Sequence, residues 1–439
     1  MRSYRRRLVA LVSSTVLAVP GVAAAAPTVT TLDGPSADVR IAGGIDIAAD
    51  GTGALTYIKA DGGVDHVFVS RLSGGSWSAP QRVDVAPALA ARDAKVAAYP
   101  GGGTVVTWLH GAGDGHLRSA ISTATGQPFQ IADVVDLAVV KAYDLDVAPD
   151  GTGYVSFTEG FNVRAARLSG GAWTQIGGAT AVDPAGILDR TPGAEAADPG
   201  GQNESDIAAY DGGAVMIWSE TDGGQRDVIA RRLTGTAVGP AQELSVDVLG
   251  GKPRGDLTDM PDVAVGPDGT AWTTFRHGQL HGATDRPRIV TRSISPAGTV
   301  GAPQIVDGLP DAPTEGAEFP AVDLSPDGNH GLVVTPRQLT FHTFGSRLSG
   351  GAWAQGTPVS SGTPTAGRPA ATAVGSTGFG VIAWSRVEGA SESVEAVSGA
   401  GVLAAPSERL SVDGAGEIAF NDTETVTAGA DSTGTTHVL

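Results

Sequence analysis

The sequence predicts an all-β fold, a β-propeller made of four-stranded antiparallel blades. A phrase of about 50 residues recurs about eight times along the chain, most clearly at residues 45–57, 145–157 and 262–275. Each copy contains two hairpin patterns, which supply four strands. Because a repeat of this kind cannot bury its own apolar face, the copies must stack against one another in a ring.

The first hairpin of each copy turns at a glycine and is followed by a large apolar residue. The turn residues are Gly51, Gly102, Gly151, Gly212, Gly269, Gly328 and Gly378, with Ser432 in the last copy. Six residues later stand Tyr57, Trp108, Phe157, Trp218, Phe275, Val334, Trp384 and Val438. Such a column suits packing between neighbouring sheets, so we expect it in the core.

The second hairpin of three copies carries the string Leu-Ser-Gly-Gly-(Ser/Ala)-Trp. This string places Trp77, Trp173 and Trp353 just after an outer turn. We expect these side chains to cap blade edges rather than to bind sugar. Small Ala and Val residues before the first turn suit the innermost strand, where the blades converge on the axis.

The number of blades depends on how the chain ends. Seven copies are complete, whereas the eighth begins near Glu424 and stops at Leu439 after its second strand. A half blade leaves unpaired strand edges. We therefore predict eight blades, the last completed by residues 27–32 of the mature N-terminus, with seven blades and a disordered tail as the alternative.

The first 25 residues have the pattern of a signal peptide. A basic region with Arg2, Arg5, Arg6 and Arg7 precedes an apolar stretch at 8–19 and small residues at 22–26. The alternative, an uncleaved anchor, would need a longer apolar run. We predict cleavage after Ala25, secretion, and one propeller domain over residues 26–439. The general secretory route is preferred, with twin-arginine export as the alternative.

Composition excludes several classes of function. The chain has no cysteine, so thiol nucleophiles, thiolate metal sites and disulfides are excluded. The signal segment holds four of the 29 basic residues and none of the 47 acidic ones, so its removal leaves a net charge of −22. This charge argues against nucleic acid and anionic membrane surfaces as partners. No later segment is apolar enough to span a membrane, and we expect a soluble extracellular monomer.

Long connections between blades are predicted on the same face as the loops that join second and third strands. They carry an acidic crescent formed by Asp183, Asp189, Glu195, Asp198, Glu204, Asp247, Asp256, Asp259, Asp307, Asp311, Glu315 and Glu318. Carboxylates are ligands that calcium prefers, although no Asp-x-Asp-x-Asp-Gly loop is present. Calcium is therefore a hypothesis, with Asp256 and Asp259 as candidate ligands, and no other cofactor is expected.

A polar residue follows the aromatic column by two positions in most copies. The set is Lys59, His110, Glu159, Glu220, His277, Pro336 and Arg386. We take Lys59, His110 and Arg386, together with Arg276, as candidate ligand-binding residues. Glu159 and Glu220 could form an acid/base pair, with His277 as a further catalytic candidate. The alternative interpretation is that these residues are strand ends meeting solvent.

The Asp-Gly-Thr turns and the Gly-Gly-(Ser/Ala)-Trp strings resemble secreted bacterial propellers of the sialidase and Asp-box group. An Asp-box reads Ser-x-Asp-x-Gly-x-x-Trp, whereas Asp268 here stands directly before Gly269, and no Arg-Ile-Pro motif occurs. The resemblance implies the propeller fold without its catalytic signature. We therefore expect a binding or scaffold module for an extracellular glycan, polymer or protein. A glycan-active hydrolase or lyase with carboxylates at the channel mouth, and a purely structural surface protein, are the alternatives.

Overall fold

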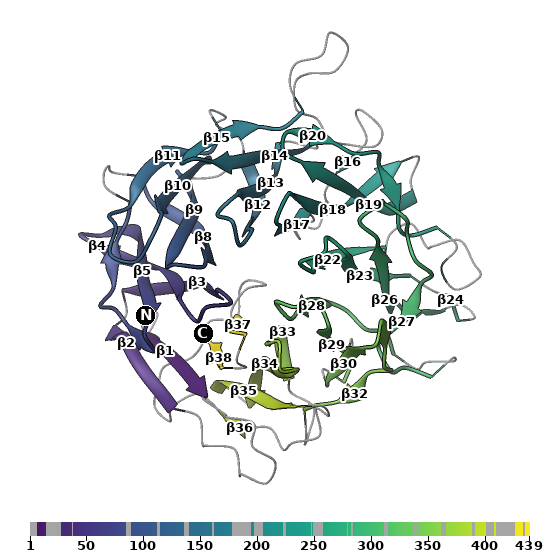
Figure 1. Ribbon diagram of the computed structural model, residues 1–439. Coiled ribbons are helices and arrows are strands. Elements are labelled where there is room, and N and C mark those ends of the chain that lie inside the picture. The colour runs from purple at the N-terminus through teal and green to yellow at the C-terminus, as the bar shows by residue number, and fades with distance from the viewer. Residues whose placement is uncertain are drawn as a thin grey trace.

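A computed structural model of the chain is a ring of β-sheets around a central axis (Figure 1). It describes residues 7–14, 28–36, 38–84, 89–111, 115–135, 140–159, 162–177, 195–196, 205–222, 225–246, 248, 258–278, 280–281, 284–310, 315–337, 339–340, 342–360, 366–388, 391–400, 408–409, 426–432 and 435–439. These residues form strands, turns and loops without a helix. The predicted all-β propeller of four-stranded antiparallel blades is confirmed.

Blades 1 to 4 follow one another along the chain. Blade 1 contains β3 (Val39–Ile47), β4 (Gly53–Asp61), β5 (Val64–Ser73), β6 (Ser76–Trp77) and β7 (Gln81–Arg82). Blade 2 contains β8 (Ala91–Tyr99), β9 (Gly103–His110), β10 (His116–Ser122) and β11 (Gln130–Asp133). Blade 3 contains β12 (Val140–Val147), β13 (Gly153–Glu159), β14 (Asn162–Ser169) and β15 (Ala172–Gln175). Blade 4 contains β16 (Glu195–Ala196), β17 (Ser205–Tyr210), β18 (Gly213–Asp222), β19 (Gln225–Thr234), β20 (Ala237–Val238) and β21 (Gln242–Glu243).

Blades 5 to 7 continue the ring. Blade 5 contains β22 (Asp259–Val265), β23 (Ala271–His277), β26 (Arg288–Ile294) and β27 (Gln304–Ile305), and β24 (Leu280–His281) pairs with β25 (Thr284–Asp285) in a small separate sheet. Blade 6 contains β28 (Ala321–Leu324), β29 (His330–Pro336), β30 (Thr343–Ser349), β31 (Ala352–Trp353) and β32 (Thr357–Pro358). Blade 7 contains β33 (Ala366–Val374), β34 (Phe379–Glu388), β35 (Ser391–Ala400) and β36 (Glu408–Arg409).

The two ends of the chain share one further sheet, which we call the closing sheet. Its order is β2 (Thr28–Ser36), β1 (Arg7–Ser14), β38 (Thr436–Val438) and β37 (Ala428–Ala430). The predicted count of eight blades is therefore wrong. In the described part of the chain seven blades are continuous in sequence, which matches the alternative count. The eighth copy supplies only β37 and β38, and β1 from the predicted signal segment lies between β38 and β2.

The hydrophobic core lies between neighbouring blades, as the aromatic column predicts. Seven members of the column are at most 1% exposed and Val438 is 5% exposed. In one cluster, Leu109 and Leu117 of blade 2 pack with Tyr143 and Phe157 of blade 3. Stacking of blades therefore buries apolar surface that no single blade could bury alone.

The turns between first and second strands explain the recurrent glycine. All seven turn glycines have positive φ, for example 83° at Gly151, which only glycine adopts at no steric cost. In the same turn, the Asp150 Oδ1 atom accepts a hydrogen bond of 2.8 Å from the backbone N–H of Thr152. These short turns define one face of the ring, which we call the turn face.

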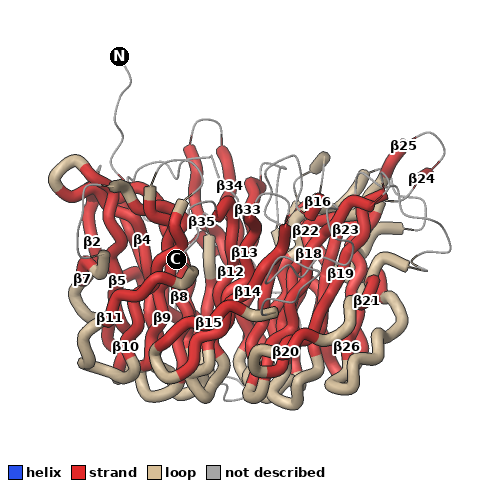
Figure 2. The backbone as a smooth tube through the Cα atoms, turned by 90° about the horizontal axis from the view of Figure 1, so that it is seen from above, coloured by secondary structure: helices blue, strands red, loops and turns tan. Residues whose placement is uncertain are grey.

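The opposite face carries the connections between blades and the loops between second and third strands. We call it the loop face. Figure 2 shows the ring edge-on, with short turns along the lower edge and the β24–β25 hairpin standing at the upper edge. Among the described residues, no helix is long and apolar enough to cross a membrane.

Partly buried aspartates connect the innermost strands of successive blades. In each case one carboxylate oxygen accepts a backbone N–H from the next blade: Asp46 from Ala98, Asp144 from Ile207, Asp146 from Ala209, Asp206 from Val263, Asp262 from Val322 and Asp323 from Val374. We call this set the aspartate straps. The innermost strands of adjacent blades are thereby joined without a shared β-ladder.

Candidate functional site

Two large apolar residues on the loop face have an unusual backbone conformation. Met260 and Phe319 have φ values of 52° and 45°. Both are partly exposed, and both lie where the chain enters an innermost strand. A positive φ at a bulky residue is an outlier that costs about 1–3 kcal/mol and marks functional sites more often than ordinary surface.

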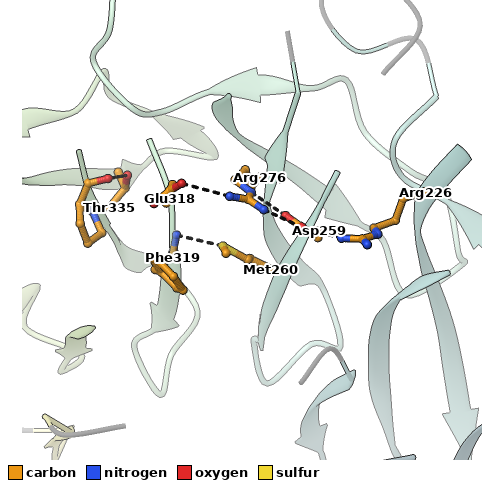
Figure 3. Close-up of polar contacts among 8 residues, drawn as sticks. Arg226, Asp259, Met260, Arg276, Glu318, Phe319 and Thr335 are labelled. Atoms are coloured by element: carbon orange, nitrogen blue, oxygen red, sulfur yellow. Dashed lines mark hydrogen bonds and ion pairs between the residues drawn. The ribbon is translucent and has the colours of Figure 1, made fainter. Parts of the chain in front are cut away.

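The two residues occupy equivalent positions and touch each other. Each lies nine residues before the turn glycine of its copy, as does Asp93, whose φ is 50°. The register of β22 against β23 shifts between Asp259 and Asp262, so Met260 sits on a bulge. The backbone N–H of Phe319 points to the Sδ atom of Met260 at 3.4 Å (Figure 3). We call Met260 and Phe319 the apolar platform.

A chain of buried ion pairs lies beside the platform and crosses blades 4 to 6 (Figure 3). The carboxylate of Asp259, 1% exposed, accepts hydrogen bonds from Arg276 Nε at 2.6 Å and Nη2 at 2.7 Å. Arg226 Nη1 reaches the same carboxylate at 2.8 Å. On its other side, Arg276 Nη1 donates to Glu318 Oε1 at 3.2 Å. The network thus alternates Arg226, Asp259, Arg276 and Glu318.

The ion-pair network holds the platform directly. Met260 follows Asp259 in the chain, and Phe319 follows Glu318. Both carboxylates are buried and held by Arg276, so the backbone on either side of them is fixed. Two guanidinium groups and two carboxylates balance in charge, and the two-pronged contact of Arg276 with Asp259 is the favourable geometry for such a pair.

Several predicted site residues have partners near their own blades instead of a shared site. Lys59 Nζ lies 2.8 Å from an Asp33 oxygen of the closing sheet. Glu159 Oε2 lies 2.5 Å from Arg164 Nε. Fully buried Glu220 accepts a hydrogen bond of 3.1 Å from Trp218 Nε1.

Burial lowers the pKa of both candidate histidines. His277 is 2% exposed, and burial, reinforced by the charge of Arg292, lowers its pKa to about 4. Burial, followed by the charge of Arg118, also lowers the pKa of His110. Arg386 belongs to β34, but its side chain lies outside the described residues.

The candidate metal ligands differ in what surrounds them. Asp256 lies outside the described residues, as do Asp183, Asp189, Asp198, Glu204, Asp247 and Asp311 of the acidic crescent, and the side chain of Glu195. Both oxygens of Asp259 accept guanidinium N–H groups, so a cation at this carboxylate would compete with Arg226 and Arg276. Within the described ranges, no three His, Asp or Glu side chains are grouped to hold a metal ion.

A cavity of about 280 Å³ lies on the axis at the turn face, away from the platform. Its lining includes Asp46, Asp146 and Asp323 of the aspartate straps. Burial raises the pKa of Asp146 and of Asp323 to about 7. Each of these carboxyl groups accepts a backbone N–H from the next blade, so it has a structural role in joining adjacent blades.

The sequence pointed to ion-pair residues of the site but not to the apolar platform. It selected Arg276 and Asp259 for different roles, and the structure joins them in one ion pair. It missed the platform because Asp93, Met260 and Phe319 share an offset from the turn glycine but not a residue type. The offset itself was the available signal.

No family model matches the sequence, and no curated protein matches it. Among solved structures, the polysaccharide lyase Uly1 has a TM-score of 0.48 at 9% identity, over 88% of this chain and 97% of that one. The α-L-arabinanase of Penicillium chrysogenum, complexed with arabinobiose, has a TM-score of 0.39 at 13% identity, over 66% and 87%. AofleA from Arthrobotrys oligospora has a TM-score of 0.41 at 14% identity, over 74% and 88%. Similarity at this level says nothing about activity, and the assignment of a propeller rests on the strand topology.

Proposed function

We propose that this protein is a secreted binding module that holds an extracellular glycan against its loop face. The observation that carries the proposal is the apolar platform. Met260 and Phe319 stay partly exposed in a strained conformation that a buried ion-pair network maintains. Sugar rings offer apolar C–H faces that pack on such side chains, while polar neighbours fix their orientation.

Other apolar side chains are exposed near the loop face. The large hydrophobic residues that stand exposed in the described chain are Ile41, Leu89, Val246 and Leu339, at 41% to 60% exposure. Each lies in or beside a segment that reaches the loop face: the start of β3, the approach to β8, the end of β21 and the turn after β29. Loops on a rigid scaffold commonly carry recognition.

Binding is preferred over catalysis because the candidate acid and base groups are already engaged. Glu159 pairs with Arg164, and Glu220 accepts the indole N–H of Trp218. A general acid needs a proton near the working pH, whereas His277 with a pKa of about 4 is neutral there. A glycan-active enzyme is the alternative function.

The test uses the mature chain from residue 26 and affinity electrophoresis through gels that contain single polysaccharides, with calcium and with a chelator. A ligand should also raise the melting temperature by mass action. Phe319→Ala should weaken retention by about tenfold or more, since one lost aromatic contact is worth at least about 1.4 kcal/mol. Phe129→Ala is the matched control, because Phe129 is a partly buried aromatic residue between β10 and β11, on the turn face.

Three outcomes would decide the matter. Retention that is lost with Phe319→Ala and kept with Phe129→Ala supports the proposal. If no polysaccharide is retained, or if both variants behave alike, the proposal is wrong. Release of sugar fragments from a retained polysaccharide would favour the enzyme. Circular dichroism checks folding, and Phe319→Leu provides a milder second variant.

A further inference from the structure

Arg337 is a buried cation whose hydrogen bonds are incomplete. It is 3% exposed, and its guanidinium stacks on the ring of Phe344 at 3.7 Å. Its Nε and Nη1 atoms are buried and have no hydrogen-bond partner among the residues that the structure describes. A buried donor left unpaired costs about 1–3 kcal/mol, and more when it is charged. The side chain is therefore short of an acceptor.

Asp307 and Glu315, the two acidic residues whose charges act on Arg337, already serve other donors. The Asp307 carboxylate accepts hydrogen bonds from Arg288 Nε at 2.8 Å and Nη2 at 3.0 Å. The backbone N–H groups of Ile289 and Leu309 donate to the same carboxylate at 2.9 and 2.8 Å. These four hydrogen bonds saturate Asp307.

Glu315 is engaged through one of its two oxygens. Its Oε2 atom accepts hydrogen bonds from the backbone N–H and the hydroxyl of Thr340, at 3.1 and 2.9 Å. Burial lowers the pKa of Arg337, the charges of Asp307 and Glu315 oppose this shift, and that of Arg288 adds to it. The guanidinium nevertheless stays charged at any physiological pH. Arg337 is thus a fixed cation with donors left over.

Arg337 lies close to the apolar platform. It forms an isolated bridge with Ala317, two residues before Phe319. The backbone N–H of Glu318 donates to the carbonyl of Pro336 at 3.0 Å, which fixes the two segments side by side. A ligand on Phe319 would therefore lie beside the end of β29, which Arg337 directly follows.

We propose that Arg337 receives an anionic substituent of the bound glycan, either a uronic-acid carboxylate or a sulfate ester. This inference rests on the proposed function and assigns its ligand to the acidic polysaccharides. Guanidinium groups suit such anions because their planar donors match carboxylate and sulfate oxygens, and the interaction strengthens away from water. The mature chain carries a net charge of −22, so non-specific electrostatics would repel a polyanion. Retention of a polyanion would then report a local site.

The experiment compares polygalacturonate, dextran sulfate and neutral dextran in affinity gels. Arg337→Lys keeps the charge but removes the planar donors, and it should weaken retention by one acidic polymer by about tenfold or more. Arg347→Lys is the matched control. Arg347 lies on β30 nearer the turn face and donates from Nη2 to the Gly399 carbonyl at 3.0 Å. In the described part of the chain its buried Nε also has no hydrogen-bond partner. Its substitution should leave retention unchanged.

The outcomes separate this inference from the proposed function. If Arg337→Lys weakens retention by polygalacturonate, the anion is a carboxylate. If it weakens retention by dextran sulfate, the anion is a sulfate ester. Equal retention of neutral and acidic polymers, or equal effects of the two lysine variants, overturns the role of Arg337 while binding stands. Absence of any retention overturns the proposed function itself. If Arg337→Lys fails to fold, the unmodified protein is tested instead with galacturonate or inorganic sulfate added to the gel as a competitor of the polymer. If neither compound reduces retention, the role of Arg337 is overturned.

Discussion

The Oδ2 atom of Asp146 accepts a hydrogen bond of 2.7 Å from the backbone N–H of Ala209, 63 residues further along the chain. The Oδ1 atom of the same carboxyl accepts the N–H of Val147 at 2.7 Å. One partly buried side chain therefore joins the innermost strands of blades 3 and 4. Because the other aspartate straps repeat this contact, stability should depend on how these carboxyl groups titrate.

The first prediction is that the protein becomes more stable as the pH falls from 8 to 5. The pKa of Asp146 and of Asp323 is raised by burial to about 7, against 3.8 for an ordinary aspartate. The folded state therefore holds protons that the unfolded state releases, and this stabilisation is lost as the pH rises towards and through 7. Urea denaturation at each pH measures the slope.

Asp146→Asn is the control for that slope. The amide cannot titrate, so at pH values between the ordinary 3.8 and the folded pKa of about 7 the slope should fall by up to about 1.4 kcal/mol per pH unit. The variant also gives up one acceptor for a backbone N–H, so it should be less stable at pH 5, where the unmodified carboxyl keeps its proton in the folded state. A slope equal to that of the unmodified protein would contradict the assignment.

The sequence predicted the blades and the core but not the aspartate straps. The turn glycines and the aromatic column predicted blades and core, since each recurs at one offset and answers one local requirement. Asp144, Asp206 and Asp262 stand in similar Ala- and Val-rich strands, but their role depends on the adjacent blade. A contact over some 60 residues leaves no periodicity in one strand.

The candidate site shows the same limit. Arg276 and Asp259 could be selected as site candidates by residue type. Their pairing, however, depends on a bulge in β22 that no local sequence pattern predicts. Met260 and Phe319 were missed because strain is a property of φ, not of composition. The blade count was ambiguous for a related reason, since the closing sheet joins opposite ends of the chain.

The second prediction concerns the buried ion-pair network. Asp259→Ala should reduce the free energy of unfolding by about 3–5 kcal/mol, because it leaves Arg226 and Arg276 buried beside an empty position. Asp65→Ala is the matched control. It breaks the pair with Arg40, whose side chains are both 39% exposed, and should cost at most about 1 kcal/mol. Similar losses of unfolding free energy in the two variants would show that the ion-pair network does not stabilise the fold.

The third prediction is that His277 and His437 remain neutral through the mildly acidic range. Burial lowers the pKa of each to about 4; the charge of Arg292 adds to the shift at His277, and that of Asp431 opposes it at His437. In NMR spectra of histidine-labelled protein, their ring signals should not move between pH 8 and 5.5. Either signal titrating near pH 6.5 would mean that the imidazole meets water.

The last prediction concerns how the ring is closed. Asp33 of β2 contacts blade 1 through Lys59 Nζ at 2.8 Å and the Tyr57 hydroxyl at 2.5 Å. Signal cleavage after Ala25 would remove β1 and leave β2 as the N-terminal strand that these contacts anchor. In the uncleaved chain, where β1 joins β2 to β38, Asp33→Ala should lower the melting temperature and speed amide hydrogen exchange in β37 and β38 before exchange rises in blades 3 to 5. Asp38→Ala, an exposed change nearby, should do neither. Uniform exchange across all blades in Asp33→Ala would mean that the ring opens as one unit and that the closing sheet is not its weakest junction.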